Sequence, residues 1–224
     1  MKQKFGIPQE GLKFIACLTM LIDHIGAVFF PTVAWFRIIG RISFPLYCFL
    51  LAEGIHHTRN PRKYFLRLLF IALITEIPYD LLFSGQLTWA KNSVMVTLLL
   101  GFAMGISMEK LPMWAKSLPV IPFAYISRYF HGTYGMEGLL MIAIFLLPRA
   151  LPFRMLIQSV LMVLLSLRMA GFPGNISIQF YAILALIPIW LYSGKKCSRS
   201  SILQWVITLF YPLHIVILLL IRGI

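Results

Sequence analysis

Long apolar segments, separated by short loops that carry most of the charge, dominate this sequence of 224 residues. Hydrophobic residues make up 60% of the chain and charged residues 12%, about half the share that is usual in soluble domains. The mean hydropathy is +0.86. Because the apolar residues form long blocks and do not alternate with polar ones, the sequence predicts an all-α, polytopic membrane protein.

About nine apolar segments (eight to ten) qualify as membrane spans, and together they predict a single transmembrane domain, residues 1–224. A helix that crosses the hydrocarbon core at right angles needs about 20 residues, and several segments are shorter. The segment interrupted by Pro112, Pro119 and Pro122 is expected to be kinked or re-entrant. The predicted spans are 11–30, 34–55, 64–83, 92–108, 113–128, 134–148, 153–170, 176–193 and 201–221.

The formal net charge is +13, and the cations gather in the short loops between the predicted spans. A basic face that binds nucleic acid would collect them on one soluble surface, so this class of partner is excluded. With a cytoplasmic N-terminus most loop cations fall on the cytoplasmic side, as the positive-inside rule requires. Cys17, Cys48 and Cys197 are scattered, with no spacing typical of disulfides or metal sites.

Two ionisable residues, Asp23 and His24, lie deep inside the first apolar segment. Such groups are costly in a bilayer, so their usual interpretation is functional. Lys13 precedes His24 by eleven residues (24 − 13). That spacing brings the two side chains to nearly the same helix face, about 16 Å apart along the axis. It indicates a line from a charged cofactor near one membrane surface to a reacting group near mid-depth.

Other ionisable residues within the predicted spans need partners as well. Buried charges pair or become neutral, so Arg41 is expected to bond one of the carboxylates. Arg37 shares a helix face with Arg41, and its alternative role is to snorkel to the interface. Glu76 and Asp80, four residues apart on one face, form either a reactive pair or a polar seam between helices.

Three more positions have both a structural and a functional interpretation. Glu137 follows two glycines and is expected at the exposed entry to a span. His214 follows Pro212 in mid-span and is either a hydrogen-bonded core residue or part of the site. The basic loop 58–67 either fixes the topology and touches anionic lipid, or presents arginines that bind phosphate.

Several runs of residues form a specific combination: an Asp-His pair in the first span, Gly-Arg-x-x-Phe-Pro in the second and Tyr-Pro-x-His near the end. This combination resembles the TraX family, named for a conjugation protein that acetylates pilin. The resemblance extends over nearly the whole chain and is weakest at about 105–130. The runs that carry it are 11–26, 37–46, 52–54, 57–60, 64–68, 76–80, 191–196 and 210–214.

The TraX family is similar in turn to a broader group of membrane acyltransferases that modify surface sugars. That group has a basic residue, ten intervening residues and a histidine in its first span, a spacing that Lys13 and His24 reproduce. Its arginine pair resembles Arg59 or Arg62 together with Arg67. Where that group has a Ser-Gly step, this chain has Glu53 before a glycine, which leaves the role of Glu53 open.

The resemblance implies a multi-pass enzyme of the bacterial cytoplasmic membrane that takes an acetyl group from cytoplasmic acetyl-CoA. The implied acceptor is an amine or hydroxyl of a pilin, another peptide or a surface glycan. Acetyl-CoA is the expected acyl donor, and no metal is expected. The cations expected to hold the CoA phosphates are Lys13, Arg59, Arg62, Lys63 and Arg67.

The same resemblance suggests roles for the residues inside the spans. His24 is the expected general base, since an imidazole with a pKa of about 6.5 exchanges protons at neutral pH. His214 is the second acid or base, or it positions the acceptor, and Arg41 stabilises developing oxyanion charge. Asp23 points about 100° away from His24 and orients a partner such as Arg41. The residues expected to bind the acceptor are Glu76, Asp80, Glu137 and Tyr211.

Two other classes of function fit the sequence. Intramembrane Asp, Glu and His residues also form the proton relays of transporters, although no pair of matching half-chains is visible. A non-catalytic scaffold of a conjugation or surface-assembly system would need neither Lys13 nor His24. As acceptor, a surface sugar or a secreted peptide fits the residues as well as the N-terminus of a pilin does.

Overall fold

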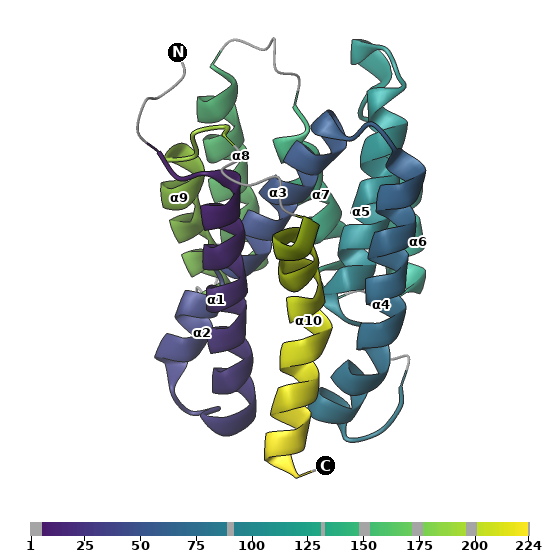
Figure 1. Ribbon diagram of the computed structural model, residues 1–224. Coiled ribbons are helices and arrows are strands. Elements are labelled where there is room, and N and C mark those ends of the chain that lie inside the picture. The colour runs from purple at the N-terminus through teal and green to yellow at the C-terminus, as the bar shows by residue number, and fades with distance from the viewer. Residues whose placement is uncertain are drawn as a thin grey trace. The chain divides into compact units, whose positions relative to one another are not determined.

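A computed structural model describes residues 6–88, 92–130, 133–147, 153–171, 177–195 and 201–223 (Figure 1). In these ranges the chain forms helices joined by turns, which confirms the all-α prediction. Two compact units can be distinguished: Met1–Leu50 with Met155–His214, and Leu51–Arg154 with Ile215–Ile224. The division falls within two helices, α3 and α10, so each of them contributes to both units.

The helices of the first unit come from both ends of the chain. They are α1 (Gln9–Phe29), α2 (Ala34–Gly40), the start of α3 (Ser43–His57), α8 (Arg154–Met169), the 3-10 helix η2 (Ile178–Ala185), α9 (Leu186–Trp190) and most of α10 (Ser201–Arg222). The second unit holds the end of α3, α4 (Pro61–Ser84), α5 (Val94–Glu109), the 3-10 turn η1 (Met113–Ala115), α6 (Val120–Tyr129), α7 (Gly135–Phe145) and the end of α10.

In the first unit α1 and α2 pack side by side as a tight hairpin (Figure 1). Two glycines allow this close approach. A Cβ atom on Gly26 would lie 2.2 Å from the Cβ of Phe36, and one on Gly40 would lie 2.0 Å from Asp23 Oδ1. Small residues at a contact let two helix backbones come together, as in other membrane helix pairs. The hairpin therefore places Asp23 directly against the end of α2.

The start of the chain is held by a segment near its other end. The backbone N–H of Ile7 donates to Leu191 O over 2.8 Å, and the N–H of Ser193 donates to Ile7 O over 3.0 Å. Gln9 N–H then donates to Lys195 O over 2.9 Å. These bonds satisfy backbone groups that would otherwise be unpaired before α1 begins, and they fix α1 relative to the residues that follow α9.

The second unit has an apolar core of its own. Helix α4 begins where Asn60 Oδ1 accepts from the N–H of Lys63 over 2.9 Å, with Pro61 in the first turn. The Arg222 guanidinium, at the end of α10, donates to the carbonyl of Leu82 near the end of α4. Fully buried side chains fill the interior: Phe102, Met104, Leu139, Met141, Ile142 and Leu146.

Within the described ranges, three of the predicted spans are interrupted and do not form continuous α-helices. The span 34–55 is broken by a turn at Arg41 and Ile42, between α2 and α3. In the span 113–128, the α-helix begins only at Val120, because three prolines interrupt the segment. The span 176–193 contains the 3-10 helix η2, followed by the short α9.

Among the described residues, three helical segments are long and apolar enough to cross a bilayer: Gln9–Phe29, Ala34–His57 and Trp205–Arg222. The second of these includes the turn at Arg41. Helix α4 has 24 residues, enough in length, but it carries five charged side chains. The number of spans and their orientation stay predictions.

Candidate functional site

His24 and His214 form a direct hydrogen bond, although they lie on different helices and 190 residues apart in sequence. His24 Nδ1 lies 2.8 Å from His214 Nε2. The two rings are nearly parallel, with 9° between their planes and 5.0 Å between their centroids. An N–H in one ring plane thus points at a ring nitrogen of the other. The structure brings together the two histidines that the sequence marked separately.

A second bond defines which nitrogen of each neutral ring carries the proton. His214 Nδ1 lies 2.8 Å from the carbonyl oxygen of Phe210, which can only accept. His214 must therefore donate from Nδ1, so its Nε2 carries the lone pair that accepts from His24 Nδ1–H. In neutral His24 the lone pair then lies on Nε2. The bonds run in one direction, from His24 through His214 to Phe210.

Aromatic side chains of α10 surround this pair. The ring of Phe210 lies parallel to His214 at 5.0 Å, with 15° between the planes. Tyr211 meets both imidazoles edge-on, at 6.4 Å from His24 and 5.5 Å from His214. Tyr211 and His214 are buried. Tyr211, a predicted acceptor-binding residue, thus packs against the histidine pair.

Asp23, the neighbour of His24 on α1, lies between two guanidinium groups of the α2 segment. Arg37 Nη1 donates to Asp23 Oδ2 and Arg41 Nη2 donates to Asp23 Oδ1, each over 2.8 Å. The Asp23 and Arg41 side chains are 14% and 12% exposed, so the pair is largely buried. The prediction that Arg41 bonds a carboxylate is confirmed. Arg37 has the same carboxylate as its partner, so both arginines of α2 and its end are paired with Asp23.

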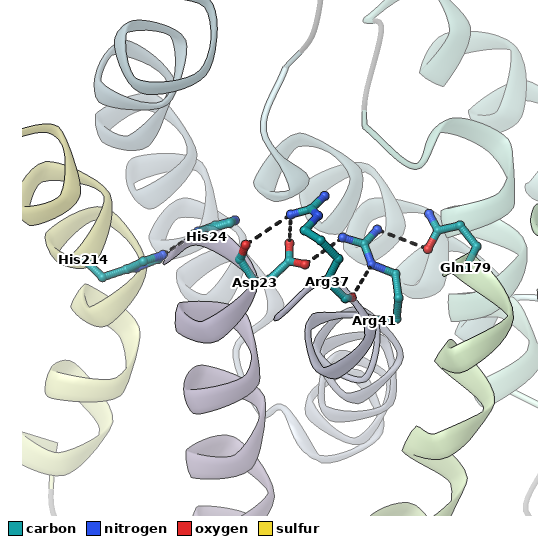
Figure 2. A network of polar contacts seen from close by, with 6 residues as sticks. All are labelled: Asp23, His24, Arg37, Arg41, Gln179 and His214. Atoms are coloured by element: carbon teal, nitrogen blue, oxygen red, sulfur yellow. Dashed lines mark hydrogen bonds and ion pairs between the residues drawn. The ribbon is translucent and has the colours of Figure 1, made fainter. Parts of the chain in front are cut away.

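Arg41 is held on all three of its nitrogens. Its Nε donates to the carbonyl of Arg37 over 3.2 Å, and Nη1 donates to Gln179 Oε1 over 3.1 Å. Gln179 belongs to η2, whose first turn is capped by the Ser177 hydroxyl. Figure 2 shows the result as a row of polar side chains, from His214 on α10 across α1 and α2 to Gln179.

Lys13 lies on the same continuous helix as His24, so the helical spacing predicted between them holds. Its side chain is half-buried. One turn further along the same face, the Cys17 thiol and the Tyr47 hydroxyl are 3.3 Å apart. Lys13, Cys17 and His24 thus lie along one stripe of α1, with Lys13 near the start of the helix.

The two predicted acceptor-binding carboxylates of α4 belong to the second unit, where they hold the residues that lead into α5. Glu76 accepts from the Ser93 hydroxyl over 2.5 Å and from the Ser93 N–H over 3.1 Å. Asp80 Oδ2 accepts from the N–H of Thr88 over 2.9 Å. Of the two alternatives left open, these contacts favour a polar seam between helices.

Replacing Glu76 by alanine is expected to destabilise the protein by about 1–3 kcal/mol, because the Ser93 hydroxyl and N–H lose their acceptor. Thermal unfolding of the detergent-solubilised protein measures this loss. Glu76→Gln, which keeps one acceptor oxygen, should be affected less. An Ala variant as stable as the Gln variant would contradict the role of this contact.

The basic residues of loop 58–67 also belong to the second unit. Arg59, Arg62 and Lys63 are exposed around the first turn of α4. Arg67 lies one turn further in, with its guanidinium carbon 4.9 Å from the centre of the Tyr64 ring. Glu53 is buried and its carboxylate lies 3.8 Å from His57 Nδ1, an ion pair if His57 is protonated.

Glu137 lies in the first turn of α7, where a negative charge is favourable. It is half-buried and not exposed as predicted. Gly135, two residues earlier, has a φ of +44°, so the chain turns into the helix just before Glu137. No other predicted site residue lies in this helix.

These features define the class of the protein: an all-helical membrane protein with a row of charged and titratable side chains among its apolar helices. The chain belongs to the TraX protein family, whose model matches residues 8–222.

FimC of serogroup H1 from Dichelobacter nodosus, a probable fimbrial assembly protein, is 30% identical over 226 residues, 92% of each chain. An uncharacterized protein of Rickettsia prowazekii (strain Madrid E) is 33% identical over 93 residues, 42% of this chain and 34% of its own. No solved structure matches the chain significantly.

Proposed function

We propose that this protein is a membrane-embedded acetyltransferase that moves an acetyl group from acetyl-CoA to a pilin or other peptide of a fimbrial or conjugation system. The observation that supports this most is the hydrogen-bonded pair of His24 and His214 inside apolar helices of a TraX-family chain. The name of the relative from Dichelobacter nodosus supports a role in pilus assembly.

The chemistry requires one proton to move. When an amine or hydroxyl takes an acetyl group from a thioester, the acceptor loses a proton and the departing thiolate gains one. Acetyl-CoA, when bound, supplies the activated acetyl group. His24 accepts the acceptor's proton at Nε2, where the neutral ring carries its lone pair. The histidine pair is therefore assigned to general acid–base catalysis.

His214 helps His24 to hold that proton. As His24 Nε2 gains a proton, the Nδ1 proton can shift toward His214 Nε2 along the 2.8 Å bond. The positive charge is then shared by two rings that titrate as a unit. Meanwhile the carbonyl of Phe210 fixes the orientation of His214. Asp23 and Arg41 hold α1 against α2 and so keep His24 in place.

The cations at the start of α4 fit the phosphates of CoA. Arg59, Arg62 and Lys63 are exposed and surround a helix N-terminus, where the backbone N–H groups add to the positive potential. Guanidinium groups bind phosphate through two parallel hydrogen bonds. Arg67, one turn further along α4, is a half-buried cation assigned to the same donor.

Substituting Arg62 by glutamine is expected to raise the KM for acetyl-CoA roughly fivefold, because an exposed ion pair is worth up to about 1 kcal/mol. The kcat should not change, since the pantetheine arm of acetyl-CoA separates its phosphates from the thioester that reacts. Initial rates at varied acetyl-CoA measure both constants. Lys110→Gln, which removes another exposed cation, is the matched control. An equal KM in both variants would remove Arg62 from donor binding.

The proposed function is tested with purified protein reconstituted into lipid vesicles and supplied with acetyl-CoA carrying a labelled acetyl group. Membranes with and without the protein are then examined by mass spectrometry for labelled proteins and glycans. We expect labelled pilin or peptide only in the presence of the protein. If only glycans are labelled, the acceptor is a surface sugar and not a peptide. If no product is labelled, the proposed acetyltransferase activity is wrong.

A hydrogen-bonded histidine pair within the membrane also suits a proton relay, which keeps proton-coupled transport as a second candidate. The same vesicles distinguish the two functions when they contain a dye that responds to pH. Ligand-dependent proton flux without consumption of acetyl-CoA would favour the transporter. Consumption of acetyl-CoA without flux favours the acetyltransferase.

A further inference from the structure

The cluster of Asp23, Arg37 and Arg41 carries one excess positive charge. Two guanidinium groups share a single carboxylate, each bonded to a different oxygen over 2.8 Å. A net charge among apolar helices is costly unless an opposite charge compensates it. The cluster is therefore expected to attract an anionic group.

The two arginines differ in what they can still bind. Arg41 donates from all three nitrogens, to Asp23, to Gln179 and to the Arg37 carbonyl. Arg37 donates only from Nη1, to Asp23 Oδ2 and to the Asp23 carbonyl, as far as the described residues show. Its Nε–H and Nη2–H remain, and these two groups point the same way. They form the fork that matches the two oxygens of a carboxylate.

The surroundings of this fork indicate what kind of molecule carries the anion. The Arg37 side chain is 32% exposed, whereas that of Arg41 is 12% exposed. Ala34, in the first turn of α2, and Val33, which precedes the helix, are exposed and apolar. Trp35, on the same helix, is 72% exposed. A ligand that binds Arg37 and also contacts these neighbouring side chains needs apolar surface of its own.

We propose that Arg37 binds a carboxylate of the acceptor, carried on an otherwise apolar peptide segment. This inference rests on the proposed function and specifies its substrate class. A peptide is favoured over a lipid phosphate because the relative that matches this chain over 92% of its length is a probable fimbrial assembly protein. Arg37 is bonded to Asp23, the residue before His24 on α1, so a carboxylate held at Arg37 lies in the neighbourhood of the proposed base (Figure 2).

Binding of synthetic peptides to the purified protein tests this site without acetyl-CoA. The protein is placed in nanodiscs of neutral phosphatidylcholine, and the probes are short apolar peptides with a free amine. Each probe carries one glutamate at a successive position, and each has a counterpart with glutamine. At one position the glutamate peptide should bind roughly 10- to 100-fold more tightly than its counterpart, as expected for hydrogen bonds to a charged group.

Arg37→Lys is the decisive variant. A lysine keeps a cation for Asp23, so the hairpin of α1 and α2 stays folded. It lacks the pair of parallel N–H groups with which the Arg37 guanidinium would bind the ligand's carboxylate. The preference for glutamate should disappear in Arg37→Lys and persist in Arg168→Lys, an exposed arginine of α8. Equal preference in Arg37→Lys and the wild type, or no preference in either, would overturn the proposal.

Two further results separate this site from its alternatives. If phosphatidylglycerol in the disc binds in an Arg37-dependent way while both peptides bind alike, the anion is a lipid phosphate and the peptide proposal is wrong. Acetylation that proceeds equally on glutamate and glutamine peptides would overturn the anion site and leave the enzyme intact. Conversely, Arg37-dependent binding without any acetyl transfer would support the site and contradict the proposed function.

Discussion

Replacing His24 by alanine is expected to lower acetyl transfer by about 10²- to 10⁴-fold, the usual contribution of a positioned general base. The reason is that His24 is the residue assigned to take up the acceptor's proton, and its bond to His214 helps it to hold that proton. Transfer of labelled acetate in membranes measures the loss. Leu18→Ala, at an exposed position of the same helix, is the matched control and should keep full activity.

The histidine pair makes a further prediction about additivity. If His24 and His214 share the proton, His214→Ala lowers the rate less than His24→Ala does, and the double variant is no slower than His24→Ala alone. Immunoblots of the membrane fraction establish equal amounts of each variant. Wild-type turnover by His24→Ala would remove His24 from the mechanism, and fully additive losses would mean that the two rings act independently.

Several residues of this row could be predicted from the sequence, whereas most of the contacts between them could not. Asp23, His24 and His214 were noticeable because ionisable groups are rare in apolar segments. The bond between the two histidines joins residues 190 apart, and it depends on how α1 and α10 pack. The periodicity of one helix does not specify which other helix packs against it. The contact between His24 and His214 therefore could not be predicted from one sequence.

For two residues of the row, the sequence offered little or no indication that they belong to the site. Arg37 is four residues before Arg41, which placed both on one face of α2, but snorkelling explained it equally well. Gln179 is uncharged and 138 residues from Arg41, so no rule about charge in membranes marks it. A search for amides that could satisfy a buried guanidinium would have found it as one of several.

The breaks in helical structure within the predicted spans have a local cause. Hydropathy averages over a window, so it joined α2 and α3 across the turn at Arg41, where helical pairing ends. That turn is what aims the Arg41 side chain at Asp23 and Gln179. The prolines near α6 were visible and predicted a kink, but not that the helix would shorten to ten residues.

Replacing Gly40 by alanine is expected to cause the largest loss of stability, at least about 3 kcal/mol. The new methyl group would lie 2.3 Å from the Cβ of Asp23, an atom next to the backbone that cannot swing aside. Helices α1 and α2 must then separate, and the buried carboxylate loses its two guanidinium partners. Thermal unfolding in detergent measures the change.

Ile39→Ala is the control for this substitution, because Ile39 is the preceding residue and its side chain is 37% exposed. Gly26→Ala should lower stability as well, since its methyl group would meet the Cβ of Phe36 across the same hairpin. Both glycine variants force the helices apart, but only Gly40→Ala acts directly at Asp23. Gly40→Ala unfolding at the same temperature as Ile39→Ala would mean that the row of polar residues does not need the close contact of α1 and α2, and that Asp23 finds its partners by another route.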